Sequence, residues 1–306
     1  MKHTLKMTTL TLGLSLSGLA LACSIDGKSG FLPENEMYIP AHMKGLNGGI
    51  NEAQFNSAID KVEHIYAPIV ANHGAKLKIE RNWDDGTVNA YATQTGKTWT
   101  VAMFGGLARY YTTTEDAMSL VVCHELGHHL GGAPKKGDNS GGWWGGQTGG
   151  AHDWASNEGQ ADYFATLKCL RKAFINDNNV AIAKTLNAPK TLVDACTKQN
   201  KSDKIEAALC VRMGMAGKSV SDLFSTLSKL PETKFETPDA KVVSKTDDDH
   251  PKAQCRLDTY FQGSLCDKNM NEDVSDSDET KGTCNLATGD KIGNRPLCWF
   301  KPSATH

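Results

Sequence analysis

The sequence predicts a mixed α+β fold in which a small sheet packs on the helix that carries the candidate site and the C-terminal part is mostly helical. Apolar residues recur at three- and four-residue intervals over residues 51–72, which is typical of an amphipathic helix. Three short segments rich in strand-favouring residues follow before residue 104. Helical patterns then dominate up to residue 265, so strands and helices are segregated along the chain.

Residues 1–22 are expected to be an export signal. A basic leader precedes an uncharged stretch over residues 7–22 that is too short to favour a spanning helix. Ala20 and Ala22 precede Cys23, as in a bacterial lipoprotein cleavage site that leaves the cysteine as the lipid-bearing first residue; ordinary signal cleavage is the alternative. We expect a protein exported to a bacterial envelope, lipid-anchored and facing the periplasm, or otherwise soluble in the periplasm or secreted.

Length and charge predict one sizeable domain and no nucleic-acid partner. The chain of 306 residues is long enough for one core with appendages. Its formal net charge of −2 provides no strong field for DNA or RNA. We expect a tether over residues 23–50, one domain over 51–267 and a cysteine-containing extension over 268–306.

The cysteine count favours an oxidising compartment. If Cys23 carries a lipid, an even number of the nine cysteines remains, as a disulfide framework requires. Their pairing cannot be read from the sequence, and Cys123 and Cys169 could instead be buried thiols because both lie in apolar helical patterns. The remaining cysteines are Cys123, Cys169, Cys196, Cys210, Cys255, Cys266, Cys284 and Cys298.

The first half of the domain is expected to contain two long helices separated by strands. The helix over 51–72 ends before Gly74. Strands are predicted over 76–82, 87–93 and 98–103. A helix-start signature at residues 112–115 precedes a helix that ends at Gly131, Gly132 and Pro134.

The second half is expected to be helical around a glycine-rich loop. Residues 131–155 contain many glycines and three tryptophans, which favours a mobile loop beside the site; a solvated insertion is the alternative. Ser156 can cap a helix that runs to about Phe174. Further helices are predicted over 178–186, 190–198, 202–216, 218–229 and 251–265. The acidic run over 272–279 is expected to be a solvated loop.

A His-Glu-x-x-His motif lies in the predicted helix after residue 115. His124 and His128 are four residues apart, so both imidazoles share one helix face and can reach one cation. Glu125 lies one residue round from His124, where its carboxylate can accept a proton from a zinc-bound water as the general base. The alternative is two surface histidines on an ordinary helix.

A second predicted helix supplies the third ligand that a catalytic zinc requires. Glu158 can ligate the metal while Asp162, four residues later, accepts a hydrogen bond from a ligand histidine. His129 and His152 are alternatives to Glu158, although His129 points about 100° away from His128 on the helix. A third histidine in the metzincin spacing is excluded because Pro134 stands at that position.

These residues resemble the gluzincin metallopeptidases, and within them the group of CAAX prenyl proteases and HtpX-like proteases with soluble periplasmic relatives. The resemblance covers about Asn51 to Arg256. It rests on Val88-Asn89-Ala90-Tyr91, Gly106-Leu107, the His-Glu-x-x-His motif, Glu158-x-x-Ala161-Asp162 and His250-Pro251 followed by Arg256.

The resemblance implies a zincin-like fold with one Zn²⁺ per chain. It further implies that His250 helps to stabilise the oxyanion, that Arg256 orients carboxylates or substrate, and that Asn89 and Ala90 contact substrate. The sequence departs from the pattern in a shorter interval between His128 and Glu158 and a longer one from Glu158 to His250. Without membrane helices in the sequence, the soluble envelope branch is implied, whose members act on unfolded or misassembled proteins.

The sequence thus predicts a zinc metalloendopeptidase that acts on envelope proteins or peptides. An extended substrate is expected to add as a strand to an edge strand over residues 98–103. The alternative function is an inactive, zinc-stabilised binding or chaperone-like lipoprotein whose glycine- and tryptophan-rich loop covers the cleft. The oligomeric state is left open, and membrane contact is expected only through a lipid on Cys23.

Overall fold

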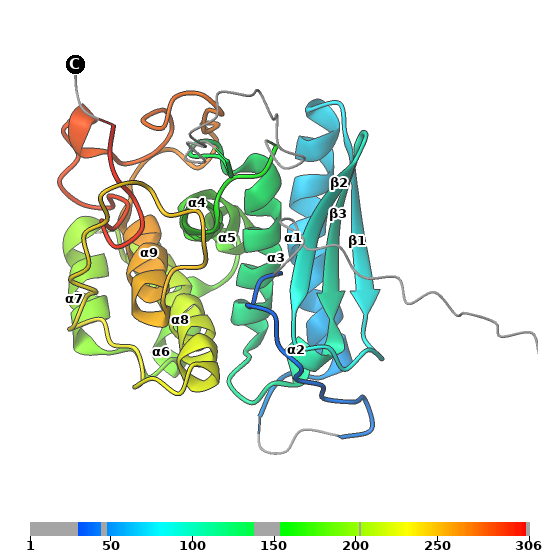
Figure 1. Ribbon diagram of the computed structural model, residues 1–306. Helices are drawn as coiled ribbons and strands as arrows, with labels where there is room; N and C mark the ends of the chain where they lie inside the picture. The colour runs from blue at the N-terminus through cyan, green and yellow to red at the C-terminus, as the bar shows by residue number, and fades with distance from the viewer. Residues whose placement is uncertain (1–29, 44–47, 138–153, 202, 304–306) are drawn as a thin grey trace, which may run out of the picture.

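The computed structural model describes residues 30–43, 48–137, 154–201 and 203–303. It is a mixed α+β fold, as predicted, with the sheet and α1 on one side, α3 in the middle and the later helices on the other side (Figure 1). The helices and strands are α1 (Glu52–Asn72), β1 (Lys76–Asn82), β2 (Ala90–Thr95), β3 (Thr98–Phe104), α2 (Gly105–Arg109), α3 (Glu115–Leu130), α4 (Glu158–Phe164), a π-helical segment (Ala165–Cys169), α5 (Leu170–Phe174), α6 (Asn179–Thr185), α7 (Lys190–Gln199), α8 (Lys204–Leu227), α9 (Ala253–Leu265) and a 3₁₀ turn (Leu286–Thr288).

Helix α1 begins and ends as its sequence predicts. The Asn51 side chain accepts a hydrogen bond from the Gln54 amide at 3.0 Å while the Gln54 side chain accepts one from the Asn51 amide at 3.0 Å, which satisfies two exposed donors of the first turn. After the helix, Gly74 adopts a positive φ of 74°. The buried face of α1 packs against α3 and β1.

The three-stranded sheet has the order β1-β3-β2. Strand β3 pairs in parallel with β1 and antiparallel with β2, so both of its edges are hydrogen-bonded. The prediction that residues 98–103 form an edge strand is therefore wrong. The edge strands of the sheet are β1 and β2. Strand β2 starts at Ala90 rather than at the predicted residue 87.

Helix α3 is the centre of the molecule. Thr114 caps it by accepting a hydrogen bond from the Ala117 amide, and residues 117–129 are all buried. It contacts α1, β2, β3, α4 and α8, so it is covered on every side and lacks the polar face of a surface helix. The histidine motif therefore lies inside the protein, and the alternative of two surface histidines is wrong.

The later helices differ from the prediction in two places. Asn157, not Ser156, caps α4 by accepting a hydrogen bond from the Gln160 amide. Residues 204–227 form one continuous helix, α8, where two were predicted. The glycine at the predicted break, Gly217, leaves room for α9, because a Cβ there would lie 2.6 Å from the Cβ of Tyr260. Its role is close packing and not helix termination.

Four disulfides confirm the prediction from the cysteine count. They join Cys123 to Cys169, Cys196 to Cys210, Cys255 to Cys298 and Cys266 to Cys284. The first bond links α3 to the end of the π-helical segment, so the alternative of buried thiols at Cys123 and Cys169 is wrong. The last two attach the C-terminal segment to α9 and its end.

The segments that flank the predicted domain also pack on it. Phe31 and Leu32, within the predicted tether, are fully buried, whereas residues 33–36 are exposed. Near the C-terminus, Trp299 is buried against Gly159, and its Nε1 donates to Thr259 Oγ1 at 2.9 Å. The predicted loop over 272–279 is irregular and mostly exposed. Residues 1–22 and Cys23 lie outside the described residues.

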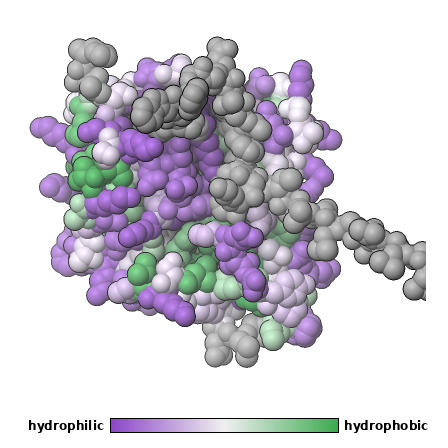
Figure 2. All heavy atoms as spheres, viewed as in Figure 1, coloured by the Kyte–Doolittle hydropathy of each residue, from purple (hydrophilic) through white to green (hydrophobic). Residues whose placement is uncertain are grey.

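The surface in Figure 2 is hydrophilic over most of its coloured area, and apolar residues gather there in small separate groups. Among the helices of the described residues, none has the length and apolar character needed to cross a bilayer.

Candidate metal centre

Two imidazoles face each other on adjacent turns of α3. The Nε2 atoms of His124 and His128 are 3.2 Å apart, and both side chains are fully or almost fully buried. Their rings meet edge to face with centroids 4.8 Å apart. The spacing of four residues therefore produces the shared helix face that the sequence predicts.

The other ring nitrogens fix which atoms are available for a metal. His124 Nδ1 lies 2.8 Å from Asp162 Oδ1, and His128 Nδ1 lies 2.8 Å from the Ser156 carbonyl oxygen. Both partners accept hydrogen bonds, so each Nδ1 is the donor. In the neutral rings, each Nε2 then presents a lone pair toward the other.

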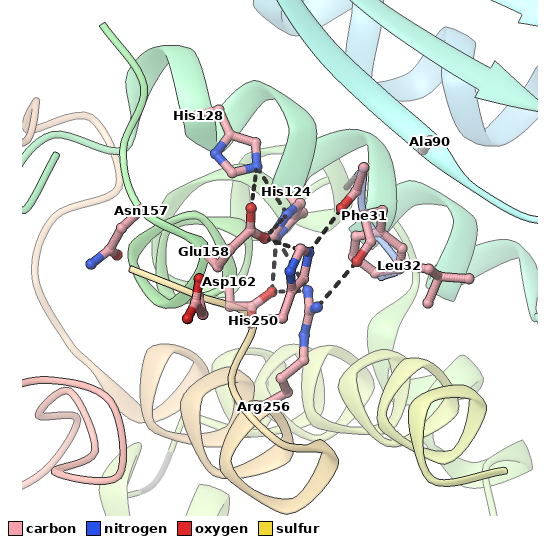
Figure 3. A network of polar contacts seen from close by, with 12 residues as sticks. Phe31, Leu32, Ala90, His124, His128, Asn157, Glu158, Asp162, His250 and Arg256 are labelled. Atoms are coloured by element: carbon pink, nitrogen blue, oxygen red, sulfur yellow. Dashed lines mark hydrogen bonds and ion pairs between the residues drawn. The ribbon is translucent and has the colours of Figure 1, made fainter. Parts of the chain in front are cut away.

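Glu158, the first residue of α4, brings a carboxylate to the same point (Figure 3). Its Oε2 lies 3.3 Å from His124 Nε2, and its Oε1 lies 3.7 Å from His128 Nε2. When both rings are neutral, three acceptors converge in a buried site, an arrangement that favours a cation between them. His124, His128 and Glu158 could therefore hold a metal ion.

The pKa values show the same preference for positive charge. Burial lowers the pKa of His124, but Asp162 and Glu158 outweigh burial and raise it to about 9 in the metal-free protein. Burial raises the pKa of Glu158, yet the nearby His250 and Lys136 outweigh this and hold it well below its usual range. Glu158 is thus ionised and available as a ligand.

Glu125 is buried beside the histidines without a hydrogen-bond partner. Neither carboxylate oxygen has one among the described residues. Burial raises the pKa of Glu125 to about 7. An unpartnered buried carboxylate is destabilising, which marks Glu125 as a candidate functional residue.

Asp162 positions His124 as the sequence predicts, with two further contacts. Its Oδ1 accepts hydrogen bonds from Arg256 Nη2 at 2.6 Å and from the Tyr260 hydroxyl at 2.5 Å, besides that from His124. Arg256 is fully buried and lies over the ring of Phe224. Arg256 therefore acts through Asp162 and is a positioning residue; Tyr260, which sequence reasoning missed, is one helical turn after it on α9.

His250 lies at the centre of the site although it precedes α9 in an irregular segment. Its Nε2 is 3.2 Å from Glu158 Oε2 and 2.8 Å from the Gly30 carbonyl oxygen, to which it donates. The structure therefore brings His250 to the ligands, as the resemblance implies.

Lys136 is a second residue that sequence reasoning missed. Its Nζ donates to Glu158 Oε1 at 2.8 Å, and 9% of its side chain is exposed. In the sequence it follows Lys135 at the start of a glycine-rich stretch, where nothing distinguishes it from a surface lysine. It supplies a positive charge next to the carboxylate ligand.

The two alternative ligands have different outcomes. His129 is stacked between Trp99 and Trp154, with ring centroids 5.0 and 4.6 Å away, and does not join the group. His152 lies outside the described residues.

Asn89 and Ala90 border the site and bind the chain itself. The Asn89 side chain accepts from the Leu32 amide at 2.9 Å and donates to the Leu32 carbonyl oxygen at 3.2 Å. The Ala90 carbonyl oxygen accepts from the Phe31 amide at 2.8 Å. These two residues therefore bind main-chain groups of a neighbouring segment, which is the property expected of a substrate-binding edge.

No protein-family model matches this chain, and no match was found among the curated proteins or the solved structures.

Proposed function

We propose that the chain is a zinc metalloendopeptidase with a zincin-like fold of the gluzincin type. The observation that carries this proposal is the buried convergence of His124, His128 and Glu158 with the unpartnered carboxylate of Glu125 beside them. Two imidazoles and one carboxylate are the donor set of many catalytic zinc sites, whereas structural sites are usually closed by four protein ligands.

Each residue of the candidate site would have a separate role in peptide hydrolysis. Zinc, when bound, would polarise the peptide carbonyl and lower the pKa of water. Glu125 would accept the proton of the attacking water, because its raised pKa of about 7 suits a general base near neutral pH. His250 would donate to the carbonyl oxygen as negative charge develops there. Asp162, held by Arg256, would keep His124 in the tautomer that presents Nε2.

A peptide substrate would add as a strand to the edge of β2 at Ala90. The support for this placement is that Asn89 and Ala90 already bind main-chain groups of Phe31 and Leu32, and the Phe31 ring lies 4.9 Å from that of His124. Main-chain pairing of this kind accepts many sequences, which suits unfolded or misassembled envelope proteins as substrates.

Export is the location we propose. Four disulfides persist in an oxidising compartment such as the periplasm or the cell exterior. A lipid on Cys23 would hold the domain at the membrane surface.

One observation favours the second candidate, an inactive zinc-stabilised binding protein. The metal ligands are nearly inaccessible, because the residues around them include the chain's own Phe31. This candidate predicts bound zinc without peptidase activity.

Metal removal and reconstitution test the proposal. The purified chain should contain one zinc per molecule, lose cleavage of casein on chelation and regain it with zinc. A Glu158→Gln variant should bind zinc at least about tenfold more weakly, because the amide is a poor zinc ligand. A chain that holds zinc but leaves casein intact under all conditions would support the binding protein instead.

A further inference from the structure

The segment Gly30–Leu32 lies at the start of β2, and its Phe31 lies beside the candidate metal ligand His124 (Figure 3). The Phe31 amide donates to the Ala90 carbonyl oxygen at 2.8 Å, as a paired strand would. Further along, the Ile39 amide donates to the Gly86 carbonyl oxygen at 2.7 Å, and Tyr38 forms an antiparallel bridge with Thr87. The chain from Phe31 to Ile39 therefore runs antiparallel to residues 86–90, and Phe31 bonds to β2 at its first residue.

Two carbonyl oxygens of this segment accept hydrogen bonds from His250 and Arg256. His250 Nε2 donates to the Gly30 carbonyl oxygen at 2.8 Å, and Arg256 Nη1 donates to that of Phe31 at 3.3 Å. His250 is the residue that would face a substrate carbonyl in the proposed reaction. The Gly30 carbonyl oxygen thus accepts the hydrogen bond from His250 that a substrate carbonyl oxygen would accept.

The Phe31 side chain fills a buried apolar pocket next to the first ligand. Its ring meets the His124 imidazole edge to face at 4.9 Å and the Phe224 ring at 5.4 Å, and Arg256 lies over it at 4.7 Å. It is fully buried. A large apolar side chain with this environment is a specific anchor and not a chance surface contact.

Gly30 is the residue that allows the segment to approach so closely. A Cβ at this position would lie 2.2 Å from the Ala90 carbonyl oxygen and 2.5 Å from the Tyr91 ring. The first of these atoms is backbone, so the sheet edge cannot move aside easily. Any larger residue would push the segment away from β2.

We propose that Gly30–Leu32 is an intramolecular, substrate-like inhibitor that occupies the peptide groove of the resting protein. This inference rests on the proposed function. Because the segment is part of the same chain, its effective concentration at the groove is on the order of millimolar, so even a weak contact keeps the groove filled. Competing substrates are extended peptides that place a large apolar side chain in the Phe31 pocket.

Two full-chain variants loosen the segment by different means. Gly30→Ala expels it by collision with Ala90 and leaves the Phe31 anchor in the sequence. Phe31→Ala removes the anchor. If the segment fills the groove about nine-tenths of the time, the KM for an apolar peptide should fall about tenfold in both zinc-loaded variants.

Two matched variants control for indirect effects. Phe55→Ala removes an equally buried phenylalanine from α1, and Glu34→Ala alters an exposed residue just after the segment. Neither should lower KM. A fall in KM with Phe55→Ala as large as with Phe31→Ala would overturn the inference, since general loosening would then explain both.

A binding measurement separates this inference from the proposed function. The peptide acetyl-Gly-Phe-Leu-Pro-Glu should bind the inactive Glu125→Gln chain about tenfold more tightly when Gly30→Ala is added. If the chain that retains Glu125 hydrolyses casein but neither loosening variant changes KM or peptide affinity, the inference fails and the function stands. If peptide binding tightens but no variant hydrolyses any substrate, the function fails and occupation of the groove stands. Wild-type protein found by mass spectrometry to be cut between Gly30 and Phe31 would identify the segment as a substrate and overturn its role as an inhibitor.

Discussion

His250 donates a hydrogen bond to the carbonyl oxygen of Gly30 at 2.8 Å, although 220 residues separate the two in the chain. The same Nε2 lies 3.2 Å from Glu158, so one imidazole joins the N-terminal segment to the candidate metal ligands. The candidate ligands are therefore linked to a segment that lies outside the predicted domain.

Asp162 should determine how tightly the site binds zinc. The Asp162→Asn variant weakens the acceptor that fixes the His124 tautomer, so we expect zinc affinity to fall by about 10- to 100-fold in competition with a chromophoric chelator. Asp258→Asn is the matched control, because Asp258 is also a buried aspartate but bonds only to Asp239 and Gln254 in the described structure. Equal affinities for the two variants would contradict the role of Asp162.

Zinc affinity should rise with pH. In the metal-free protein the Asp162 and Glu158 carboxylates overcome the effect of burial and raise the pKa of His124 to about 9, so below this pH the ring carries an extra proton. That proton must leave before Nε2 can bind a metal ion. Affinity should therefore increase by about tenfold per pH unit between about pH 6 and 8 and level off above the pKa. A zinc affinity that stays constant with pH, after correction for protonation of the competing chelator, would contradict this prediction.

Removing the Cys123–Cys169 disulfide should destabilise the protein more than removing the Cys196–Cys210 disulfide. The Cys123–Cys169 bond has a sequence separation of 46, which corresponds to about 4 kcal/mol of loop entropy, against about 3 kcal/mol for the separation of 14 between Cys196 and Cys210. Urea unfolding of the two double-alanine variants measures the difference. A smaller loss for Cys123→Ala/Cys169→Ala would show that loop entropy does not govern these bonds.

Gly217→Ala sets helix propensity against packing. Alanine inside a helix is favoured over glycine by about 1 kcal/mol, whereas a Cβ here would lie 2.6 Å from the Cβ of Tyr260. Crowding of a tight core typically destabilises by about 1–3 kcal/mol. We expect net destabilisation in urea and a weaker hydrogen bond from Tyr260 to Asp162. A stabilised variant would mean that α8 and α9 separate easily at this point.

The local parts of the fold follow from the sequence because their signals are local. The ends of α1 and β1 match the pattern of apolar residues, caps and glycines. The ligand group follows from spacing, since residues four apart on a helix must share a face.

What the sequence did not reveal depends on contacts between distant residues. Strand order is decided by pairing that leaves no local signal, so the central position of β3 was missed. A glycine such as Gly217 is typical of a helix end, so the sequence predicted a break there. The glycine is needed instead because Tyr260 of another helix packs against it. Phe31 lies in an aperiodic stretch rich in glycine and proline, and its contacts with Ala90 and His124 are visible only in the structure.

The central claim is that Glu125 acts as a base beside a zinc ion held by His124, His128 and Glu158. The most direct test is casein cleavage by the zinc-loaded Glu125→Gln variant, with zinc content measured on the same sample. The account predicts wild-type zinc content and cleavage reduced by at least about a hundredfold, the lower range for loss of a general base. Undiminished cleavage by a zinc-loaded Glu125→Gln chain would contradict it.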